Sequence, residues 1–571
     1  MQEIKEIKNK EKIIIKIIKS DIKTRYDLMM VKKKMAKKYK INVITNSDIL
    51  SVYAELVKAK KFKPSNTLEM ILRKRAIRTM SGIASVAVLT MPYPCPGKCA
   101  YCPTQKDVPQ SYLSNEPAVM RAIRCDFNPY IQVEYRLKAL IANGHRPEKI
   151  ELIVIGGTWS VLPEKYKFWF IKECFKAANG LEKKVSEKLE IGNLKLGKQI
   201  SNFKFQNFPP NADSPLAEKL KIDKLKNELN LEQKKNEKAK YRIIGITLET
   251  RPDYIDKEEL LEMRELGCTR VEMGVQVVDD DILKLNQRGH GIKEIAKATK
   301  QLKNFGFKVT YHIMPGLPGS TPSKDLKMFK QLFSDERFQP DQIKFYPTVV
   351  TKGSKLYKWW KAGKYKPYSD KVLKKLIIEC KKVVPKYVRI IRLIRDIPGE
   401  SIVAGNLITN LRQVLEQEGV KCRCIRCREI KNGNFKAKSY KLKAISYKAS
   451  GGIEYFISFE TGDGKYLLGF CRLRLSSRIM YHASHNNLNG PFDYDTALMR
   501  ELHVYGELMP VGKNKKIQHT GLGKKLMAEA ERIAVKNGYK KMAVIAGVGV
   551  RDYYRKMGYK LKETYMIKNI D

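Results

Sequence analysis

Six short apolar runs, each separated from the next by sequence with helical periodicity, constrain the fold more than any other feature. The runs occupy residues 81–90, 149–158, 242–250, 270–278, 308–319 and 342–350. Strands that alternate with helices form βαβ units, and such units build a parallel sheet. The sequence therefore predicts an α/β domain whose sheet forms a partial (βα) barrel. In such sheets, functional residues follow the carboxyl ends of the strands.

Three cysteines follow the first run, namely Cys95, Cys99 and Cys102, with gaps of three and two residues. Three thiolates hold a four-iron cluster but leave one iron open, and S-adenosylmethionine (SAM) chelates that iron through its amino and carboxylate groups. Electron transfer into the sulfonium then releases methionine and a 5′-deoxyadenosyl radical. This spacing after a first barrel strand is typical of the radical SAM enzymes. The alternative is a three-cysteine zinc site.

Residues suited to binding a cofactor recur after later runs. Gly156 and Gly157 follow the second run, where glycine lets the backbone approach a ligand. Thr158 stands where radical SAM enzymes usually carry glutamate. The segment 249–253 and Gln276 follow the third and fourth runs. Each alone also suits a turn or a satisfied core polar group, but their ordered recurrence predicts contacts with the cofactor.

The C-terminal third has a different pattern, with antiparallel-looking strands and one well-formed helical segment. Gln518, Gly521 and Gly523 open that helix, and free backbone N–H groups at a helix N-terminus bind a pyrophosphate. This order of elements resembles that of the GNAT acetyltransferases, which bind acetyl-CoA. It consists of a strand, the pyrophosphate loop, the helix, another strand and a short helix that carries tyrosines. A tyrosine hydroxyl there meets the thioester sulfur. Tyr553 and Tyr554 are candidates, unless they pack as ordinary aromatics.

The charge balance predicts a polyanionic partner. The chain has 111 Lys+Arg against 60 Asp+Glu, a formal net charge of +51, which nucleic acid would exploit. A general bias toward lysine is the alternative. The segments "MRAIRCDFNPY" and "KFYPTVVTKG" mix basic and aromatic residues, as an RNA-binding surface does, although a solvated basic face is also open. No apolar run is long enough to cross a bilayer and no signal peptide is recognisable, so we expect a cytoplasmic protein without membrane contact.

A second cysteine group, Cys422, Cys424 and Cys427, suits zinc bound by thiolates. The sequence does not identify a fourth zinc ligand. The candidates are Cys380 and the histidines His312, His482, His485 and His503. The predicted organisation is a basic helical region at 1–80, a radical SAM domain at 81–400 with a charged insertion at 181–238, a zinc-binding linker at 401–435 and a GNAT domain at 436–571.

Together these stretches resemble the catalytic subunit of the Elongator family over about residues 70–571, excluding the charged insertion. The resemblance is carried by "IRTMSGIASVAV", "CAYCP", "GITLETRPDY", "GCTRVEMGVQ", "MPGLPG", "RELHVYGELMPV", "QHTGLG" and "YYRKMGY". It implies conversion of uridine 34 in the tRNA anticodon stem–loop to 5-carboxymethyluridine, from acetyl-CoA and with SAM radical chemistry. In that reaction the radical takes hydrogen from the acetyl methyl group, the carbon radical adds to C5 of the uridine, and thioester hydrolysis releases CoA. The basic region at 1–80 would bind tRNA, and a homodimer is a candidate assembly.

The resemblance also implies roles for single residues. Cys95, Cys99 and Cys102 would hold the [4Fe-4S] cluster, and Lys149 would contact acetyl-CoA as a catalytic residue together with Tyr554 at the thioester. The remaining acetyl-CoA contacts would come from Glu501, Leu502, His503 and Val504 on a strand and from Leu522, Gly523 and Lys524 at the pyrophosphate loop.

Two features depart from the eukaryotic members. Those members space the first two cluster cysteines further apart, and they lack the second cysteine group. A rival reading is a protein-lysine acetyltransferase with a structural cluster, which needs a general base such as Glu501 or Glu507. A methylthiotransferase-like tRNA enzyme and a non-catalytic tRNA-binding scaffold are further alternatives. The methylthiotransferase-like enzyme needs no acetyltransferase domain, and the scaffold would not consume acetyl-CoA.

Overall fold

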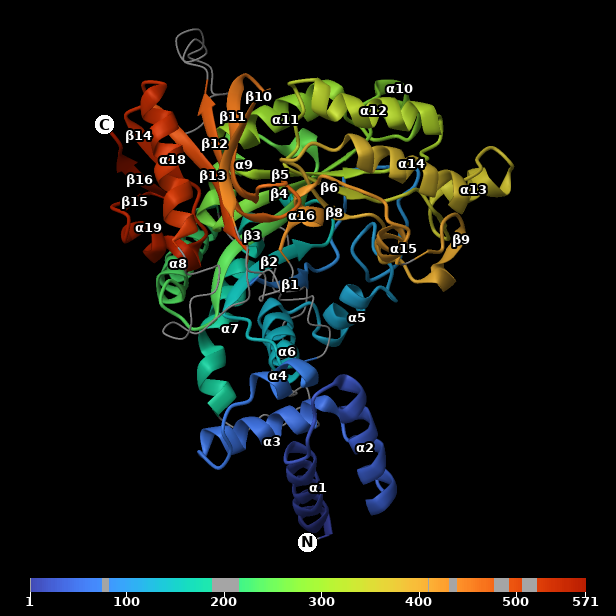
Figure 1. Ribbon diagram of the computed structural model, residues 1–571. Helices are drawn as coiled ribbons and strands as arrows, with labels where there is room; N and C mark the ends of the chain where they lie inside the picture. The colour runs from blue at the N-terminus through green and yellow to red at the C-terminus, as the bar shows by residue number, and fades with distance from the viewer. Residues whose placement is uncertain are drawn as a thin grey trace.

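The computed structural model describes residues 2–73, 82–186, 215–408, 410–430, 439–476, 492–505 and 521–571. Its first sheet has seven strands, all parallel, in the order β1-β2-β3-β4-β5-β6-β8 (Figure 1). The strands are β1 (Ala84–Leu89), β2 (Lys149–Ile155), β3 (Arg242–Thr250), β4 (Cys268–Gln276), β5 (Lys308–Ile313), β6 (Gln342–Phe345) and β8 (Arg389–Arg392). The predicted partial barrel is confirmed. The strand β8 was not expected from the sequence.

Helices connect the strands of this sheet and follow its last strand. They are α5 (Pro117–Arg124), α6 (Pro129–Ala142), α7 (Glu164–Ser186), α8 (Pro215–Asn236), α9 (Lys257–Glu265), α10 (Asp280–Leu285), α11 (Ile292–Asn304), α12 (Pro322–Ser334), α13 (Lys355–Lys361), α14 (Asp370–Val383), α15 (Leu411–Gln417) and α16 (Ile425–Arg428). A two-stranded pair, β7 (Val350–Thr351) and β9 (Ile402–Ala404), lies beside them. The helices attach by spaced apolar positions, as in α11, which buries Ile295, Ala298 and Leu302.

Part of the expected charged insertion is an integral helix. Ile222, Leu225 and Leu229 recur every three or four residues and pack α8 against the core, with Leu229 only 1% exposed. Gln233 also donates to the carbonyl of Glu265 at 2.8 Å. The charged residues hide this narrow apolar stripe in the sequence. Residues 181–186 of the expected insertion form the end of α7, and 187–214 lie outside the described residues.

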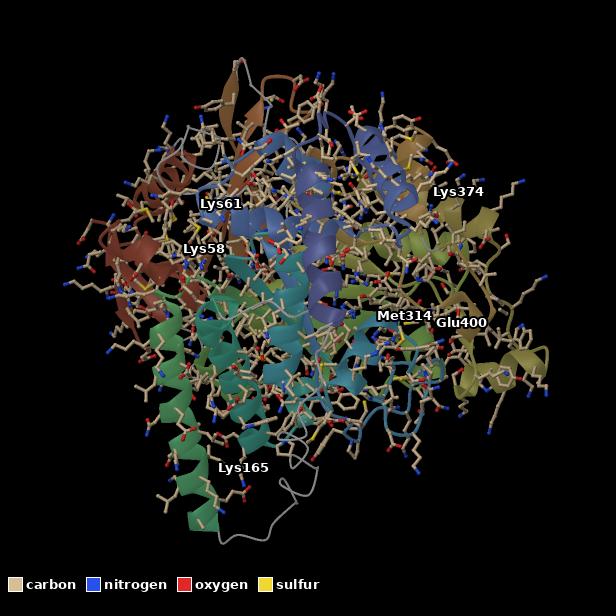
Figure 2. The ribbon with its side chains drawn as sticks, turned by 90° about the horizontal axis from the view of Figure 1, so that it is seen from below. Lys58, Lys61, Lys165, Met314, Lys374 and Glu400 are labelled. Carbon is tan, nitrogen blue, oxygen red and sulfur yellow. The ribbon has the colours of Figure 1, made fainter. Side chains whose placement is uncertain are left out.

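The N-terminal region folds as four helices with a small core of their own: α1 (Gln2–Ile18), α2 (Arg25–Tyr39), α3 (Asn46–Lys58) and α4 (Asn66–Leu72). Thr24 and Thr45 begin α2 and α3 with reciprocal capping boxes. These helices lie below the sheet domain in Figure 1. Lys58 and Lys61, labelled in Figure 2, lie on this underside.

The C-terminal domain is a mixed seven-stranded sheet in the order β10-β11-β12-β13-β14-β16-β15. Its strands are β10 (Tyr440–Ala449), β11 (Gly452–Thr461), β12 (Leu467–Ser476), β13 (Thr496–Val504), β14 (Lys541–Val544), β15 (Lys560–Lys562) and β16 (Tyr565–Asn569). The pair β13–β14 is parallel and the other pairs are antiparallel. The helix α18 (Leu522–Lys536) packs on this sheet, and α19 (Arg551–Arg555) follows β14. The predicted mixed α/β acetyltransferase fold is confirmed.

A fully buried ionic cluster joins the two domains. Arg500 on β13 donates to Asp341 at 3.1 Å, across the domain boundary, and to Glu454 at 2.7 Å. Lys303 on α11 lies 3.7 Å from Asp341 and 3.6 Å from Glu454. All four side chains are 0% exposed. Separating the domains would break the Arg500–Asp341 and Lys303–Glu454 pairs, so the cluster fixes how the domains meet.

None of the described helices combines the length and apolar character needed to cross a bilayer.

Candidate functional site

The predicted site residues fall at opposite ends of the parallel sheet. The cysteine loop follows the carboxyl end of β1, and Gly156, Gly157 and Gln276 lie at the carboxyl ends of β2 and β4. Lys149, by contrast, is the first residue of β2. A strand rises about 3.3 Å per residue, so the six steps from Lys149 to Ile155 separate the two ends by about 20 Å. The sheet therefore presents one site at each end.

At the carboxyl end, Cys95, Cys99 and Cys102 are half-buried free thiols on one loop. The Gly97 amide donates to Cys95 Sγ at 3.4 Å, and Cys95 Sγ lies 3.6 Å from the hydroxyl of Thr158. The residue that replaces the usual glutamate thus contacts a cysteine of the loop.

Glycine is required at position 156 and suits position 157 for different physical reasons. Gly156 has φ +139°, and a Cβ there would lie 2.0 Å from Thr90 Oγ1, so only glycine fits against β1. Gly157 has φ +103°, but its Cβ would meet only the Gln110 carbonyl at 3.7 Å. Gly157 therefore leaves open space beside the cysteine loop. Gln276 is a buried amide with φ +71° whose side-chain oxygen has no partner among the described residues.

Two arginines stand beside the cysteines: Arg251, which belongs to the predicted segment 249–253, and Arg288, which the sequence analysis missed. Arg288 donates to Cys99 Sγ at 3.1 Å. Arg251 donates to the Arg288 carbonyl at 2.7 Å and to Asp253 through Nε at 3.0 Å. The third nitrogen of Arg251, Nη1, is buried without a partner among the described residues. Arg251 lies in a segment predicted to contact the cofactor, but only folding brings Arg288 to the cysteine loop as well.

These residues fit an iron–sulfur cluster. The loop offers three thiol sulfurs, and N–H groups already point at two of them, as hydrogen bonds to cluster sulfurs require. Burial raises the pKa of Cys102 to about 12, so the positive charge of bound metal is what would make this sulfur a thiolate.

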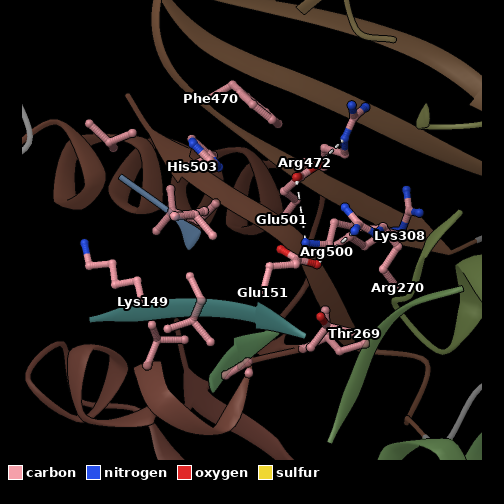
Figure 3. Close-up of a pocket in the computed structure, with 18 of the residues that line it drawn as sticks. Lys149, Glu151, Thr269, Arg270, Lys308, Phe470, Arg472, Arg500, Glu501 and His503 are labelled. Carbon is pink, nitrogen blue, oxygen red and sulfur yellow. Dashed lines mark hydrogen bonds and ion pairs between the residues drawn. The ribbon is translucent and has the colours of Figure 1, made fainter. Parts of the chain in front are cut away.

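The amino end of the sheet opens into a cavity of about 620 Å³ between the two domains. Figure 3 shows Lys149 and Glu151 on β2 facing Glu501 and His503 on β13 across this space. Of the predicted acetyl-CoA residues, those lining the cavity are Lys149, Glu501, Leu502, His503, Val504, Gly521, Gly523, Lys524 and Tyr554. Folding thus brings these residues together from both domains.

Burial and neighbouring charges determine the protonation states of Glu501 and His503 on β13. Burial opposes ionisation of Glu501, but Lys308 at 3.9 Å and Arg472 at 2.9 Å hold the pKa of its carboxyl below the usual value. Burial, and then Arg389, lower the pKa of His503 to about 4, so the imidazole is neutral at pH 7. Its Nε2 has no partner among the described residues.

The start of α18 forms the second wall of the cavity. Gly521 has φ +79° at the N-cap, and a Cβ on Gly523 would lie 2.5 Å from the Tyr553 hydroxyl. Leu522 differs from the expectation, because its side chain is 1% exposed in the core of the C-terminal domain and does not line the cavity. Burial raises the pKa of Tyr554, which keeps its phenol protonated. The predicted Gln518 lies outside the described residues.

Lys149 is held in a low-dielectric and cationic environment. Burial first, and then the neighbouring Arg242, lower the pKa of its ammonium. Both residues line the cavity and face a space where an anionic ligand would replace the lost hydration.

A polar column that the sequence analysis also missed runs through the barrel between the two ends. Arg270 lies 3.2 Å from Glu151, donates to Thr247 at 2.8 Å and to Gln342 at 3.3 Å, and lies 3.9 Å from Glu272. Glu272 in turn accepts a hydrogen bond from His312 Nε2 at 2.9 Å. The available signal was the presence of Glu151 within β2 and of Arg270 and Glu272 within β4, among mostly apolar residues.

The second cysteine group is a compact cluster of thiols. The sulfurs of Cys422, Cys424 and Cys427 all lie within 4.8 Å of one another, where α16 begins. Within the described part of the chain, no histidine, aspartate, glutamate or further cysteine joins this group at that distance. Cys380, one of the candidate fourth ligands, is buried in α14.

Comparisons with known proteins match both domains. The radical SAM superfamily matches residues 210–332, a radical SAM C-terminal domain matches 340–420, and the acetyltransferase (GNAT) family matches 434–559.

Similar proteins cover almost the whole chain. A protein named tRNA uridine(34) acetyltransferase from Dehalococcoides mccartyi is 42% identical over 507 residues, which is 87% of this chain and 100% of that protein. Elongator complex protein 3 from Bos taurus is 37% identical over 522 residues, with 88% and 86% covered. The solved structure of the archaeal Methanocaldococcus infernus Elp3 with an N-terminal deletion is 37% identical, covers 86% of this chain and 100% of that chain, and has a TM-score of 0.68. The chain therefore belongs to the family of tRNA uridine(34) acetyltransferases and Elongator complex protein 3, and it combines a radical SAM domain with an acetyltransferase domain.

Proposed function

We propose that this protein converts uridine 34 of tRNA to 5-carboxymethyluridine, taking the two added carbons from acetyl-CoA. The observation that carries the proposal is the cavity between the domains, which is lined by the acetyltransferase strand β13 and reaches into the radical SAM barrel as far as Arg270 and Gln342. A donor bound there would direct its acetyl group into the same barrel that carries the cysteine loop at its other end.

Each residue has a task that its environment suits. Cys95, Cys99 and Cys102 would hold a [4Fe-4S] cluster, and Gly157 and Gln276 would line the SAM beside it. The cluster and SAM, when bound, supply abstraction of a hydrogen atom from the unreactive acetyl methyl group.

The cavity residues would hold the donor. The free N–H groups at the start of α18, with Lys524, would bind the pyrophosphate of CoA. Lys149 would contact the donor from the barrel side. Tyr554, kept protonated by burial, would donate its hydroxyl hydrogen to the thioester sulfur as CoA leaves.

The lysine-acetyltransferase alternative is weaker on chemical grounds. A general base needs a free lone pair and a pKa near the working pH. Glu501 is paired with Arg472 and close to Lys308, which lower its pKa and make it a poor base. Glu507 lies outside the described residues.

We also propose that Cys422, Cys424 and Cys427 bind zinc. Three thiols in contact are an unstable arrangement for thiolates without a cation, and zinc prefers such soft ligands. The site lies where α16 joins the two domains, so zinc would stabilise their connection.

The test is an anaerobic reaction of reconstituted protein with SAM, a reductant, wobble-uridine tRNA and acetyl-CoA whose methyl group carries three deuteriums. We expect one deuterium in 5′-deoxyadenosine and two in the CH₂ of 5-carboxymethyluridine. Cys99→Ala should abolish both products, and Tyr554→Phe should lower the modified nucleoside at least tenfold. Cys125→Ala and Tyr440→Phe are matched controls away from both sites. Deoxyadenosine without deuterium, and unmodified tRNA, would contradict the proposal.

A further inference from the structure

A short basic and aromatic helix stands at the mouth of the radical site, and nothing in the mechanism above uses it. The segment 352–368 has six lysines and no acidic residue. These lysines are Lys352, Lys355, Lys358, Lys361, Lys364 and Lys366, and all are exposed. Within the described chain, none of them forms an ion pair with a carboxylate. We call this segment, which contains α13, the lysine–tryptophan surface.

The surface is anchored directly on the cysteine loop. The Leu356 amide donates to the Ala100 carbonyl at 2.7 Å, and the Thr104 amide donates to the Gly353 carbonyl at 3.4 Å. Gly353 has φ +82°, and a Cβ there would lie 2.9 Å from the Thr104 carbonyl oxygen, so the approach requires glycine. The segment and the loop that carries Cys95, Cys99 and Cys102 are therefore placed relative to each other by backbone contacts.

The aromatic side chains of the surface are only partly buried by packing. Leu356 is fully buried and holds α13 in a small apolar cluster with Tyr101. Tyr357 and Trp360 are half-buried and stack with 6.0 Å between ring centroids and 28° between planes. Trp359 is also half-buried, with the ammonium of Lys355 5.8 Å from its ring centroid. Part of each ring thus faces solvent among unpaired ammonium groups.

The exposed lysines and half-buried aromatic rings of this surface suit a ligand that has phosphates beside unstacked bases. Single-stranded nucleic acid is held by cations that follow the backbone and by aromatic rings on which bases stack. Lys355, Lys358 and Lys361 recur every three residues and so share one side of α13. A generally lysine-rich surface would not require two half-exposed tryptophans beside the radical site.

We infer that the lysine–tryptophan surface binds the anticodon-loop nucleotides that flank the target uridine, with the lysines on phosphates and Trp360 as a stacking platform for a base. The inference rests on the proposed function and assigns it a recognition surface. The loop must be opened for the uridine to enter the barrel, and a platform at the barrel mouth holds the neighbouring bases in that open form.

The test measures RNA binding by fluorescence anisotropy with the full, cluster-reconstituted chain. One RNA is an anticodon stem–loop with a seven-nucleotide loop and uridine at the wobble position. The other has the same stem closed by a four-nucleotide loop. The variants are Lys358→Gln/Lys361→Gln and Trp360→Leu. The matched control is Lys560→Gln/Lys562→Gln on β15, which removes the same charge at the far side of the molecule (Figure 1).

We expect Lys358→Gln/Lys361→Gln to bind the anticodon stem–loop about tenfold more weakly than the control and to reduce the slope of log affinity against log salt by about 1.5. Trp360→Leu should weaken binding of the seven-nucleotide loop about tenfold and leave the short-loop RNA unchanged. Equal binding by both variants and the control would overturn the inference, as would equal loss of both RNAs in Trp360→Leu. Thermal melting checks that each variant is folded.

The nucleoside assay separates this inference from the proposed function. If the wild-type chain binds the stem–loop through this surface but makes no 5-carboxymethyluridine, the proposed reaction fails and the surface stands. If the wild type makes the product and the variants bind as the control does, the surface alone is wrong.

Discussion

The guanidinium of Arg270 is paired with the carboxylate of Glu151 across the barrel interior, with 3.2 Å between Nη2 and Oε1. The pair lies at the inner end of the cavity, between the domain interface and the carboxyl end of the sheet. Burial raises the pKa of Glu151, but Arg270 and then Lys308 outweigh that effect and lower it. The interior of the barrel therefore carries paired charges along the path between the two sites.

Removing one partner of this pair should destabilise the barrel. Arg270→Met leaves Glu151 buried and unpaired, and we expect the melting temperature to fall by about 5 °C or more. Adding Glu151→Gln should restore most of the loss, because the buried charge is then gone. Arg337→Met is the control, since that residue pairs with Asp335 at the surface. A single variant that melts like this control would show that the pair is not important for stability.

The ionic cluster between the domains should be costly to disrupt. Asp341→Asn leaves Arg500 and Lys303 facing Glu454, while Arg472 keeps Glu501. We expect a loss of about 3–5 kcal/mol in the free energy of unfolding. Burial raises the pKa of Asp341, but Arg500 and then Lys303 hold it well below its usual value.

The same cluster gives a pH dependence with a defined sign. A lowered folded-state pKa contributes stability that is present above the unfolded value near pH 4 and is lost as pH falls below it. The wild type should therefore lose stability below about pH 4 more steeply than Asp341→Asn. Urea unfolding across pH checks this, with the exposed Asp396→Asn as control. Parallel pH profiles for wild type and Asp341→Asn would contradict it.

Acetyl-CoA affinity should depend on the charge of Lys149. Lys149→Met should weaken binding of acetyl-CoA about tenfold in calorimetry, because an ammonium facing the anionic donor is lost. Its pKa is lowered, so wild-type affinity should fall as pH rises toward that value, earlier than for an ordinary lysine. Lys149→Arg should remove this fall, since arginine stays charged. A pH-independent wild type would contradict the role.

The two glycines after β2 should respond differently to alanine. Gly156→Ala places a methyl group against Thr90 Oγ1 and should prevent correct packing of β1 on β2, with a large loss of melting temperature. Thr90→Gly should partly rescue it. Gly157→Ala should fold and retain iron but bind SAM more weakly, because its methyl group enters the open space beside the cysteines. Equal stability of the two variants would refute the distinction.

Zinc content tests the second cysteine group. We expect about one zinc per chain by elemental analysis of protein purified without chelator, and none in Cys424→Ser. Cys380→Ala should keep its zinc, because Cys380 is not grouped with the three thiols. Loss of zinc in Cys380→Ala would instead identify it as the fourth ligand.

Much of the fold follows from local pattern. All six apolar runs are strands of the parallel sheet, and the helix after Gly521 begins at Leu522. Alternating strand and helix patterns are strong signals because each element must bury one face. The strand β8 was missed because four residues, two of them arginines at its ends, carry little periodicity.

Site residues could be predicted from the sequence where a single motif contains them. They could not be predicted where the fold brings distant segments together. The cysteine triplet predicts its own chemistry, because ligand type and spacing lie within eight residues. The arginines beside it, the Arg270–Glu151 pair and the burial of Leu522 depend on which side chains meet after the sheet has formed.

Local sequence patterns were enough to predict both fold classes and to bring three cysteines onto one loop. The folded chain alone shows that Lys149 and the cysteines lie at opposite ends of one sheet, and that β13 closes the amino end. The physical reason is that strand and loop formation depend on residues near in sequence, whereas the joining of the domains depends on buried charges, such as Asp341 and Arg500, that are 159 residues apart.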